Sequence, residues 1–157
     1  MPWVNPITDR TYADILNRTS KAFFNVADWQ RIYNNTWELN QLVNNLRGLN
    51  IEFTPLTSPT IATIPSANDI NALILNIERI RLASGLPISP DLQPLKTDWQ
   101  SGFSAAAIIN YETVNTWEKN LLTMWNWIQQ SLDYLVFAGI GSAGQDRIWQ
   151  NRFRRRT

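Results

Sequence analysis

Apolar side chains recur at intervals of three and four residues in three long stretches of the chain. The stretches cover about residues 25–48, 66–85 and 110–135, and they begin with asparagine, serine and asparagine respectively. A capping residue followed by an amphipathic period is typical of an α-helix. The pattern therefore predicts three main helices.

The segments around these stretches have a different pattern. Residues 50–65 and 86–109 each contain three prolines and lack a helical period, which is typical of connecting loops. Near the start of the chain, residues 11–22 fit a short helix that is capped by Asp9 or Thr11. We therefore expect a short N-terminal helix and two long, proline-rich connectors.

The chain changes character after residue 135. Residues 134–140 suit a strand, the sequence GSAG suits a turn, and residues 147–153 alternate enough to form a second strand. We therefore expect an all-α fold, in which residues 1–135 form an antiparallel bundle of three main helices plus the short N-terminal helix. Residues 136–157 would form an extended or β-hairpin arm.

The three predicted helices share a pattern of polar positions. Aligned without gaps they read DWQRIYNN, DINALILN and TVNTWEKN, at offsets of 41 and 44 residues. Such a repeat is typical of one supersecondary unit used more than once. An amide beside the apolar stripe can hydrogen-bond the backbone of a connector. We therefore expect Asn35, Asn76 and Asn120 to fasten the connectors, the alternative being that they lie at solvated helix edges.

Composition excludes several kinds of chemistry. The 157 residues include no cysteine and no histidine, which excludes disulfides, thiolate nucleophiles, imidazole bases and the usual zinc sites. Eight tryptophans are many for this length, and tryptophan is favoured at protein interfaces. The N-terminal sequence does not resemble a secretory signal, and no apolar stretch approaches the roughly 18 residues of a membrane span. We expect a protein made in a cytoplasm, as a virion component is made in its host, with no membrane partner.

Few residues suggest catalysis. Asp9 and Asp98, each in a Thr-Asp pair, are the candidate carboxylates for glycan hydrolysis, a reaction that needs two carboxyl groups within about 10 Å. An aspartate at such a position is more simply explained as a turn former or a helix cap. We therefore expect a protein that is not an enzyme, with no catalytic, cofactor-binding or metal-binding residues and no small-molecule substrate.

The net charge of +1 is unevenly distributed. Residues 147–157 carry five arginines and no acid, whereas residues 1–146 carry nine Lys/Arg and thirteen Asp/Glu, a net charge of −4. The basic end could bind a nucleic acid by neutralising phosphates and stacking on bases. It could also bind a polar or acidic face of a neighbouring subunit, which we favour. The candidate partner-binding residues of this arm are Arg147, Trp149, Arg152, Phe153, Arg154, Arg155 and Arg156.

Four motifs follow one another along the chain. They are W-x-N-P-x-T-D-R-T from Trp3, F-N-x-x-D-x-x-R-I-x-N-N from Phe24, I-P-x-x-x-x-[IL]-N-x-[IL] from Ile64 and N-Y-x-x-x-N-x-[IW]-E from Asn110. This order resembles a group of small tail-associated proteins of phages and prophages of Gram-positive gut bacteria. The similarity extends to about residue 137, and the tail RIWQNRFRRRT departs from it.

The resemblance implies a structural role in a virion and no chemistry. We expect an adaptor in the tail region, at the baseplate or at a tail-fibre attachment point, assembled in several copies. Its chain ends would act as clasps that bind other virion proteins and copies of itself, with Trp3, Asn5, Asp9 and Arg10 forming the N-terminal clasp. The alternatives are a capsid or neck decoration protein and a nucleic-acid-binding protein.

Overall fold

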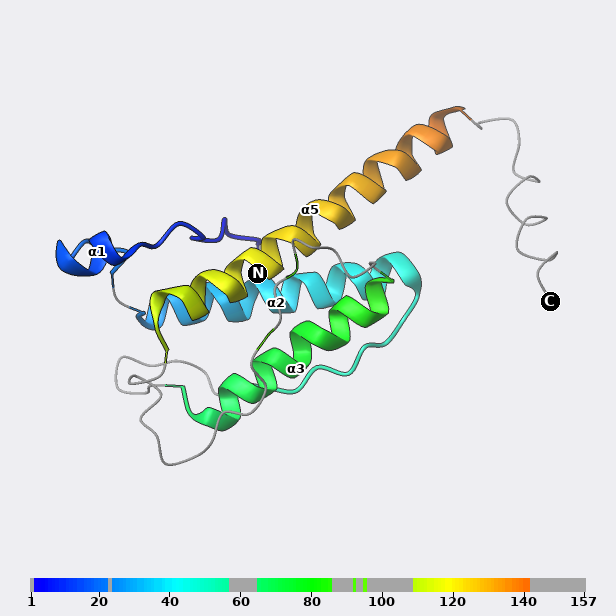
Figure 1. The fold of residues 1–157 in the computed structure, drawn as a ribbon. Coiled ribbons are helices and arrows are strands. Elements are labelled where there is room, and N and C mark those ends of the chain that lie inside the picture. The colour runs from blue at the N-terminus through cyan, green and yellow to red at the C-terminus, as the bar shows by residue number, and fades with distance from the viewer. Residues whose placement is uncertain are drawn as a thin grey trace.

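Most of the residues that the structure, a computed structural model, describes are helical (Figure 1). These residues are 2–22, 24–56, 65–85, 92, 95 and 109–141, with side chains described up to residue 132. The helices are α1 (Tyr12–Leu16), α2 (Val26–Arg47), α3 (Ala67–Ser84) and α5 (Tyr111–Gly141). No strand occurs in the described ranges, so the all-α prediction is confirmed for them.

The helix ends follow from local sequence. Asn25 caps α2 by accepting hydrogen bonds from the N–H groups of Ala27 and Asp28, and the Asp28 carboxylate accepts one from the Asn25 N–H. Ser66 and Asp69 form the same reciprocal cap on α3. Such caps satisfy backbone N–H groups that have no partner within the helix. The main helices therefore begin where the caps predict.

The core lies between α2, α3 and α5, which contact one another in all three pairs. Helices with apolar stripes on facing sides exclude water from a common interior, which is the main favourable term in folding. The buried apolar residues of this core are Trp29, Ile32, Leu39, Val43, Ile70, Leu73, Ile74, Ile77, Ile80, Val114, Trp117, Leu121, Met124 and Ile128.

The three long helices point in the same direction, so the antiparallel arrangement predicted for them is wrong. In Figure 1 the chain colour advances from left to right along α2, α3 and α5 alike. Contacts agree, because the first turns of α2 and α5 meet where Arg31 binds Glu118. The last turns of α2 and α3 also meet, since the Arg47 guanidinium lies 2.9 Å from the Cβ position of Gly85.

The length of the connector permits the parallel direction. Antiparallel neighbours need only a short loop, whereas a parallel neighbour requires the chain to return along the helix it has just formed. The 18 residues of α3 span about 27 Å at about 1.5 Å per residue. The connector of residues 49–65 can reach roughly 55 Å when extended. It is therefore long enough to bring α3 back to the starting end of α2.

The start of the chain forms a shorter helix than the pattern predicts. Helix α1 covers five residues instead of residues 11–22, and Thr11 caps it by accepting a hydrogen bond from the Asp14 N–H. Of the two caps considered, Asp9 is therefore not the one used. Arg18 has a φ of 49°, in the left-handed region that an L-residue rarely adopts, and this conformation prevents the helix from continuing.

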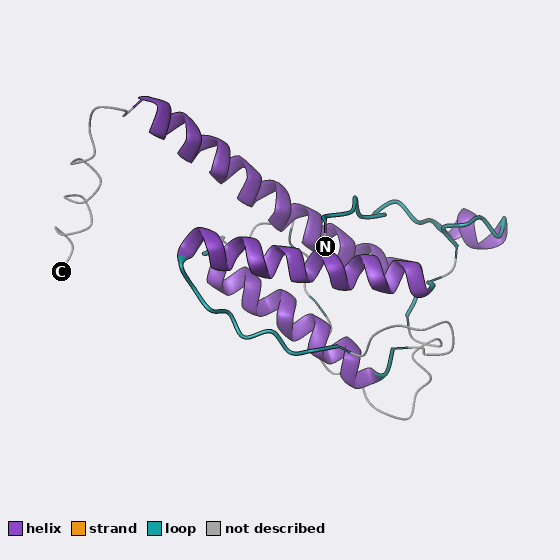
Figure 2. Cartoon of the chain, turned by 180° about the vertical axis from the view of Figure 1, so that it is seen from behind, coloured by secondary structure: helices purple, strands orange, loops and turns teal. Residues whose placement is uncertain are grey.

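The end of the described chain corrects the strand prediction. Residues 134–140 lie within α5, which continues to Gly141, so the first strand of the expected hairpin is wrong. Apolar residues at intervals of three and four extend past residue 132, and an existing helix gains one hydrogen bond for each residue added. The predicted boundary at residue 135 falls inside α5. In Figures 1 and 2 the end of α5 extends beyond α2 and α3. The second predicted strand lies outside the described residues.

Candidate functional site

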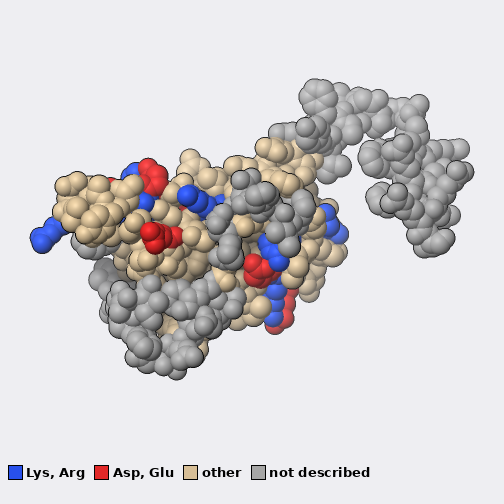
Figure 3. All heavy atoms as spheres, viewed as in Figure 1, with Lys and Arg blue, Asp and Glu red and all other residues tan. Residues whose placement is uncertain are grey.

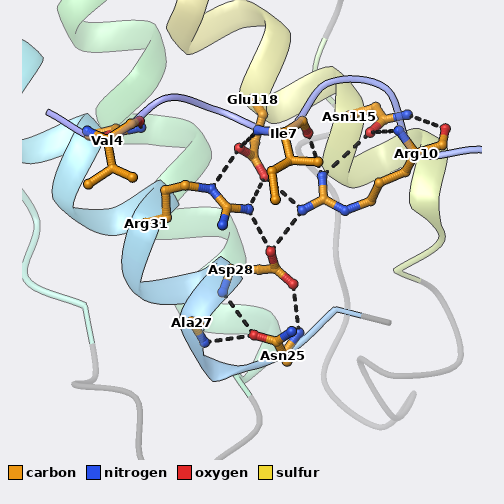
Figure 4. A network of polar contacts seen from close by, with 10 residues as sticks. Val4, Ile7, Arg10, Asn25, Ala27, Asp28, Arg31, Asn115 and Glu118 are labelled. Atoms are coloured by element: carbon orange, nitrogen blue, oxygen red, sulfur yellow. Dashed lines mark hydrogen bonds and ion pairs between the residues drawn. The ribbon is translucent and has the colours of Figure 1, made fainter. Parts of the chain in front are cut away.

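The candidate site is where the start of the chain lies across α2 and α5 (Figure 4). We call residues 2–10 the N-terminal strap. The strap is held by polar side chains of the two helices, which we call the strap-binding face. The strap-binding face consists of Asp28, Arg31 and Asn35 from α2 and Asn115 and Glu118 from α5.

Two asparagine amides each bind one residue of the strap at both its backbone groups. The Val4 N–H donates to Asn35 Oδ1 at 3.0 Å, and Asn35 Nδ2 donates to the Val4 carbonyl at 2.7 Å. The Arg10 N–H donates to Asn115 Oδ1 at 3.2 Å, and Asn115 Nδ2 donates to the Arg10 carbonyl at 2.8 Å. Each amide thus acts on the strap as a neighbouring strand would, and it satisfies backbone groups that have no partner in secondary structure.

Between these two points a carboxylate binds the strap. The Ile7 N–H donates to Glu118 Oε2 at 2.6 Å, a charge-assisted hydrogen bond. The same carboxylate accepts hydrogen bonds from Arg31 through Nε and Nη2, at 3.0 and 2.7 Å. Arg31 therefore orients Glu118 toward the strap by a two-point contact.

Arg10 carries the strap's own charge into this cluster. Its Nη2 atom lies 2.8 Å from Asp28 Oδ1 and 3.0 Å from Glu118 Oε1, and the side chains of Arg10, Asp28 and Glu118 are 2%, 6% and 1% exposed. With Arg31 the cluster holds two positive and two negative charges, so it is neutral as a whole. A buried cluster of this kind is destabilising when one member is removed, because an unpaired charge is left in a medium of low polarity.

Burial and pairing act in opposite directions on Arg31. Desolvation lowers its pKa, but the hydrogen bonds from Arg31 to Glu118 and Asp28 outweigh it, so the pKa of Arg31 is raised above its ordinary value. Arg31 therefore stays charged. Within the described chain, Arg10 Nε is buried without a hydrogen-bond partner, which is a cost that the contacts of the other guanidinium nitrogens must offset.

Aromatic contacts add an apolar anchor to the strap. The Trp3 ring stacks on Trp125 of α5, with centroids 4.3 Å apart and planes 9° from parallel. Phe24, which lies outside the strap and just before α2, packs edge-on against both Trp29 and Trp117, with ring centroids 6.3 Å apart. Such pairs contribute beyond their buried area. The strap is therefore held by backbone, charge and ring contacts together.

The same amide arrangement recurs on the next connector. We call residues 51–56 the inner connector. Asn76 of α3 accepts from the Thr54 N–H at 2.8 Å and donates to the Thr54 carbonyl at 2.8 Å. The Ile51 N–H donates to Asn44 Oδ1 at 2.8 Å. The charged contact here is at the surface, where Arg79 pairs with Glu52.

The predicted connector-binding asparagines occupy equivalent positions. Asn35 and Asn76 are 1% and 0% exposed, so they do not lie at solvated edges. Asn76 binds the backbone of the inner connector, whereas Asn35 binds the backbone of the N-terminal strap. Asn120 is 3% exposed at the corresponding place in α5, and its role in fastening a connector stays a prediction. The repeat alignment therefore located two of the polar contacts that organise the fold.

The predicted N-terminal clasp residues are only partly brought together. Arg10 binds the strap-binding face and Trp3 stacks on Trp125, whereas Asn5 is exposed. Asp9 is exposed as well and pairs with Lys21 at 2.6 Å. The hydrogen bond from Lys21 lowers the pKa of Asp9, which keeps it ionised. Asp98, its proposed companion in glycan hydrolysis, lies outside the described residues, as do the arginines and aromatic residues predicted for the C-terminal arm.

Sequence reasoning missed the charged partners of Arg10 as parts of a site. Asp28, Asn115 and Glu118 appear in the sequence analysis only as positions within motifs. A signal for Glu118 existed, because it directly follows Trp117 on the buried side of an amphipathic helix, where a carboxylate requires a partner. The identity of that partner depends on which helix ends meet.

The described residues contain no group of three or more acidic side chains placed to hold a metal ion. None of the described helices combines the length and the apolar character needed to cross a membrane. Comparison with protein-family models, with curated proteins and with solved structures found no match to this chain.

Proposed function

We propose that this protein is a non-enzymatic structural component of a virion, an adaptor in the tail region that assembles in several copies. The observation that carries the proposal is the use of its buried charges. The buried charged residues of the described chain are Arg10, Asp28 and Glu118, and the strap residue Arg10 forms ion pairs with both carboxylates. Their chemistry holds a chain segment in place, which is what an assembly protein requires.

Surface composition supports binding to other proteins. Figure 3 shows charged side chains in a few separated groups on a largely uncharged face. Large apolar side chains exposed on several elements are the material of protein interfaces. The exposed large apolar residues are Val4, Tyr12, Leu16, Trp37, Leu46, Leu49, Leu75 and Leu82.

For the arm of residues 142–157 we propose a contact with a polar or acidic face of a neighbouring subunit. Arginine suits this role because its planar guanidinium forms paired hydrogen bonds with carboxylates. The alternative of nucleic-acid binding is supported by the same arginines, next to Trp149 and Phe153. Binding to DNA that falls steeply with salt and vanishes on removal of residues 147–157 would favour that alternative.

The test of the proposed function is the position of the protein in particles. Gold-labelled antibody against the protein is imaged by electron microscopy on particles released from the producing cells. The adaptor role predicts label at one end of the tail, in more than one copy for each particle. Label on the head or neck would support the decoration alternative instead. Absence of label from all particles, with a protein that stays monomeric and binds no tail protein, would contradict a virion role.

A further inference from the structure

We propose that the N-terminal strap is exchanged between copies, so that residues 2–10 of one chain bind the strap-binding face of a second chain. The occupant of the face is then the same segment, recognised by the same contacts, and only its chain of origin changes. The inference rests on the proposed multi-copy assembly, and it names the contact that would join the copies.

The strap contacts are complete in themselves. Val4, Ile7 and Arg10 donate backbone N–H groups to the face, and the carbonyls of Val4 and Arg10 accept from it. The Arg10 guanidinium adds two buried ion pairs. None of these contacts depends on the residues that link the strap to α2. A strap from another chain can therefore form all of them, which is the condition for exchange at low cost.

The linker between the strap and α2 is built loosely. Among the described residues, the hydrogen bonds and ion pairs of residues 11–22 all lie within residues 9–22. Helix α1 has no buried residue. In Figures 1 and 2 it lies beyond one end of the three long helices. Ala22 is buried and Phe24 packs against the core, so the part that can take another path without breaking a hydrogen bond to the long helices is residues 11–21.

Two features of the linker favour an extended conformation, in which the strap leaves the helices of its own chain. Arg18 holds a left-handed φ of 49°, which is unfavourable for an L-residue and is relieved when the linker extends. Tyr12 and Leu16 are 61% and 65% exposed, so the closed linker leaves two large apolar side chains in water. When linkers of two chains cross, these side chains can pack against each other. Exchange therefore keeps the strap contacts and adds new ones.

The test uses two full-length variants that damage opposite halves of one contact. Arg10→Ala damages the strap, and Glu118→Ala damages the face. In a closed monomer each variant has one defective contact. In an exchanged heterodimer, the intact strap of the Glu118→Ala chain binds the intact face of the Arg10→Ala chain. The other contact of the heterodimer joins the Arg10→Ala strap to the Glu118→Ala face. Both members of the Arg10–Glu118 pair are absent there, so neither is left buried without the other.

The expected result is a heterodimer in native mass spectrometry, with one variant labelled with ¹⁵N. It should be at least about tenfold more abundant than either homodimer, against about twofold for random mixing, because residues in contact couple strongly. The wild-type chain should form dimers or larger species. The matched control is a mixture of Arg79→Ala and Glu52→Ala, which removes an arginine–glutamate pair from the inner connector and should give no excess heterodimer.

A mixture that contains only the species of the two separate solutions would overturn the exchange. Wild-type oligomers combined with no excess of heterodimer in the mixture would also overturn it, while leaving the multi-copy role intact through another surface. If either variant fails to fold, Val4→Pro with Asn35→Ala replaces the pair. The proline removes the N–H that donates to Asn35 at 3.0 Å without changing a buried charge. The same two outcomes decide the proposal with this pair.

Discussion

The N-terminal strap and the inner connector are bound by the same amide arrangement but by different charges. Asn35 and Asn76 each bind both backbone groups of one residue, at distances between 2.7 and 3.0 Å. The strap adds a buried cluster, whereas the inner connector adds the pair of Arg79 with Glu52, whose side chains are 28% and 77% exposed. The amide therefore determines which residue of the strap or of the inner connector is bound. The charges determine the free-energy cost of releasing that segment from the helices.

The largest effect is expected from Arg10→Ala. It leaves Asp28 and Glu118 buried with one arginine between them, and we expect a loss of about 3–5 kcal/mol in the free energy of unfolding. Arg79→Ala, at the partly exposed pair, should cost only about 0–1 kcal/mol. Urea denaturation measured by tryptophan fluorescence gives both values. Equal losses for the two variants would show that burial of the charges does not distinguish the two regions.

A smaller and matched effect is expected from the amides. Asn35→Ala and Asn76→Ala each remove two hydrogen bonds to buried or half-buried backbone, and each should cost about 1–3 kcal/mol. Because the contacts are equivalent, the two losses should agree within about 1 kcal/mol. Thermal unfolding monitored by circular dichroism provides the comparison. A loss at one position alone would mean that the repeat does not act as one structural unit.

The glycines that end α2 and α3 give the next effect. Gly48 and Gly85 both have a φ of 63°, where an L-side chain is strained, so replacement by alanine should cost about 1 kcal/mol at each. Gly48 has open space for a Cβ, whereas Gly85 lies 2.9 Å from Arg47 Nη2 at that position. Gly85→Ala should therefore cost slightly more, since the flexible end of Arg47 must move. Chemical denaturation of the two variants tests the order.

The smallest effect concerns Asp9 and pH. The hydrogen bond from Lys21 lowers the pKa of Asp9, so its contribution is present above the ordinary value of 3.8 and is lost as the pH falls through the lowered value. The pair is exposed, and the change in stability should be slight. Lys21→Ala should raise the pKa of Asp9 toward 3.8, as NMR titration of the carboxyl carbon can measure. An unchanged pKa would show that the pair does not form in solution.

Much of the fold was predictable because it depends on local sequence. Asn25 and Ser66 begin helices, and Gly48 and Gly85 end them, through bonds to residues two to five positions away. The repeat of Asn35 and Asn76 was visible for the same reason. Helix direction was not predictable from these signals, since the long connectors permit either direction and the choice depends on tertiary contacts. The strand predicted for residues 134–140 was wrong because β-forming residues can also continue a helix.

The candidate site was predictable only in part. Arg10 was placed in an N-terminal clasp, but its partners belong to two helices that are 18 and 108 residues away along the chain. Pairing at such separations follows from the parallel packing of α2 and α5, which brings their first turns together. Once that packing is known, the buried carboxylates of Asp28 and Glu118 share Arg31 and require a second cation, which Arg10 is placed to supply.

The central claim is that the strap is bound through its backbone N–H groups at every third residue. Amide hydrogen exchange tests this claim most directly. The N–H groups of Val4, Ile7 and Arg10 donate to side chains of the strap-binding face. Their exchange, followed by NMR, should be slower than in an unstructured peptide by at least about a hundredfold, an opening free energy of about 3 kcal/mol. Exchange of all three at the rate of the unstructured peptide would contradict the account.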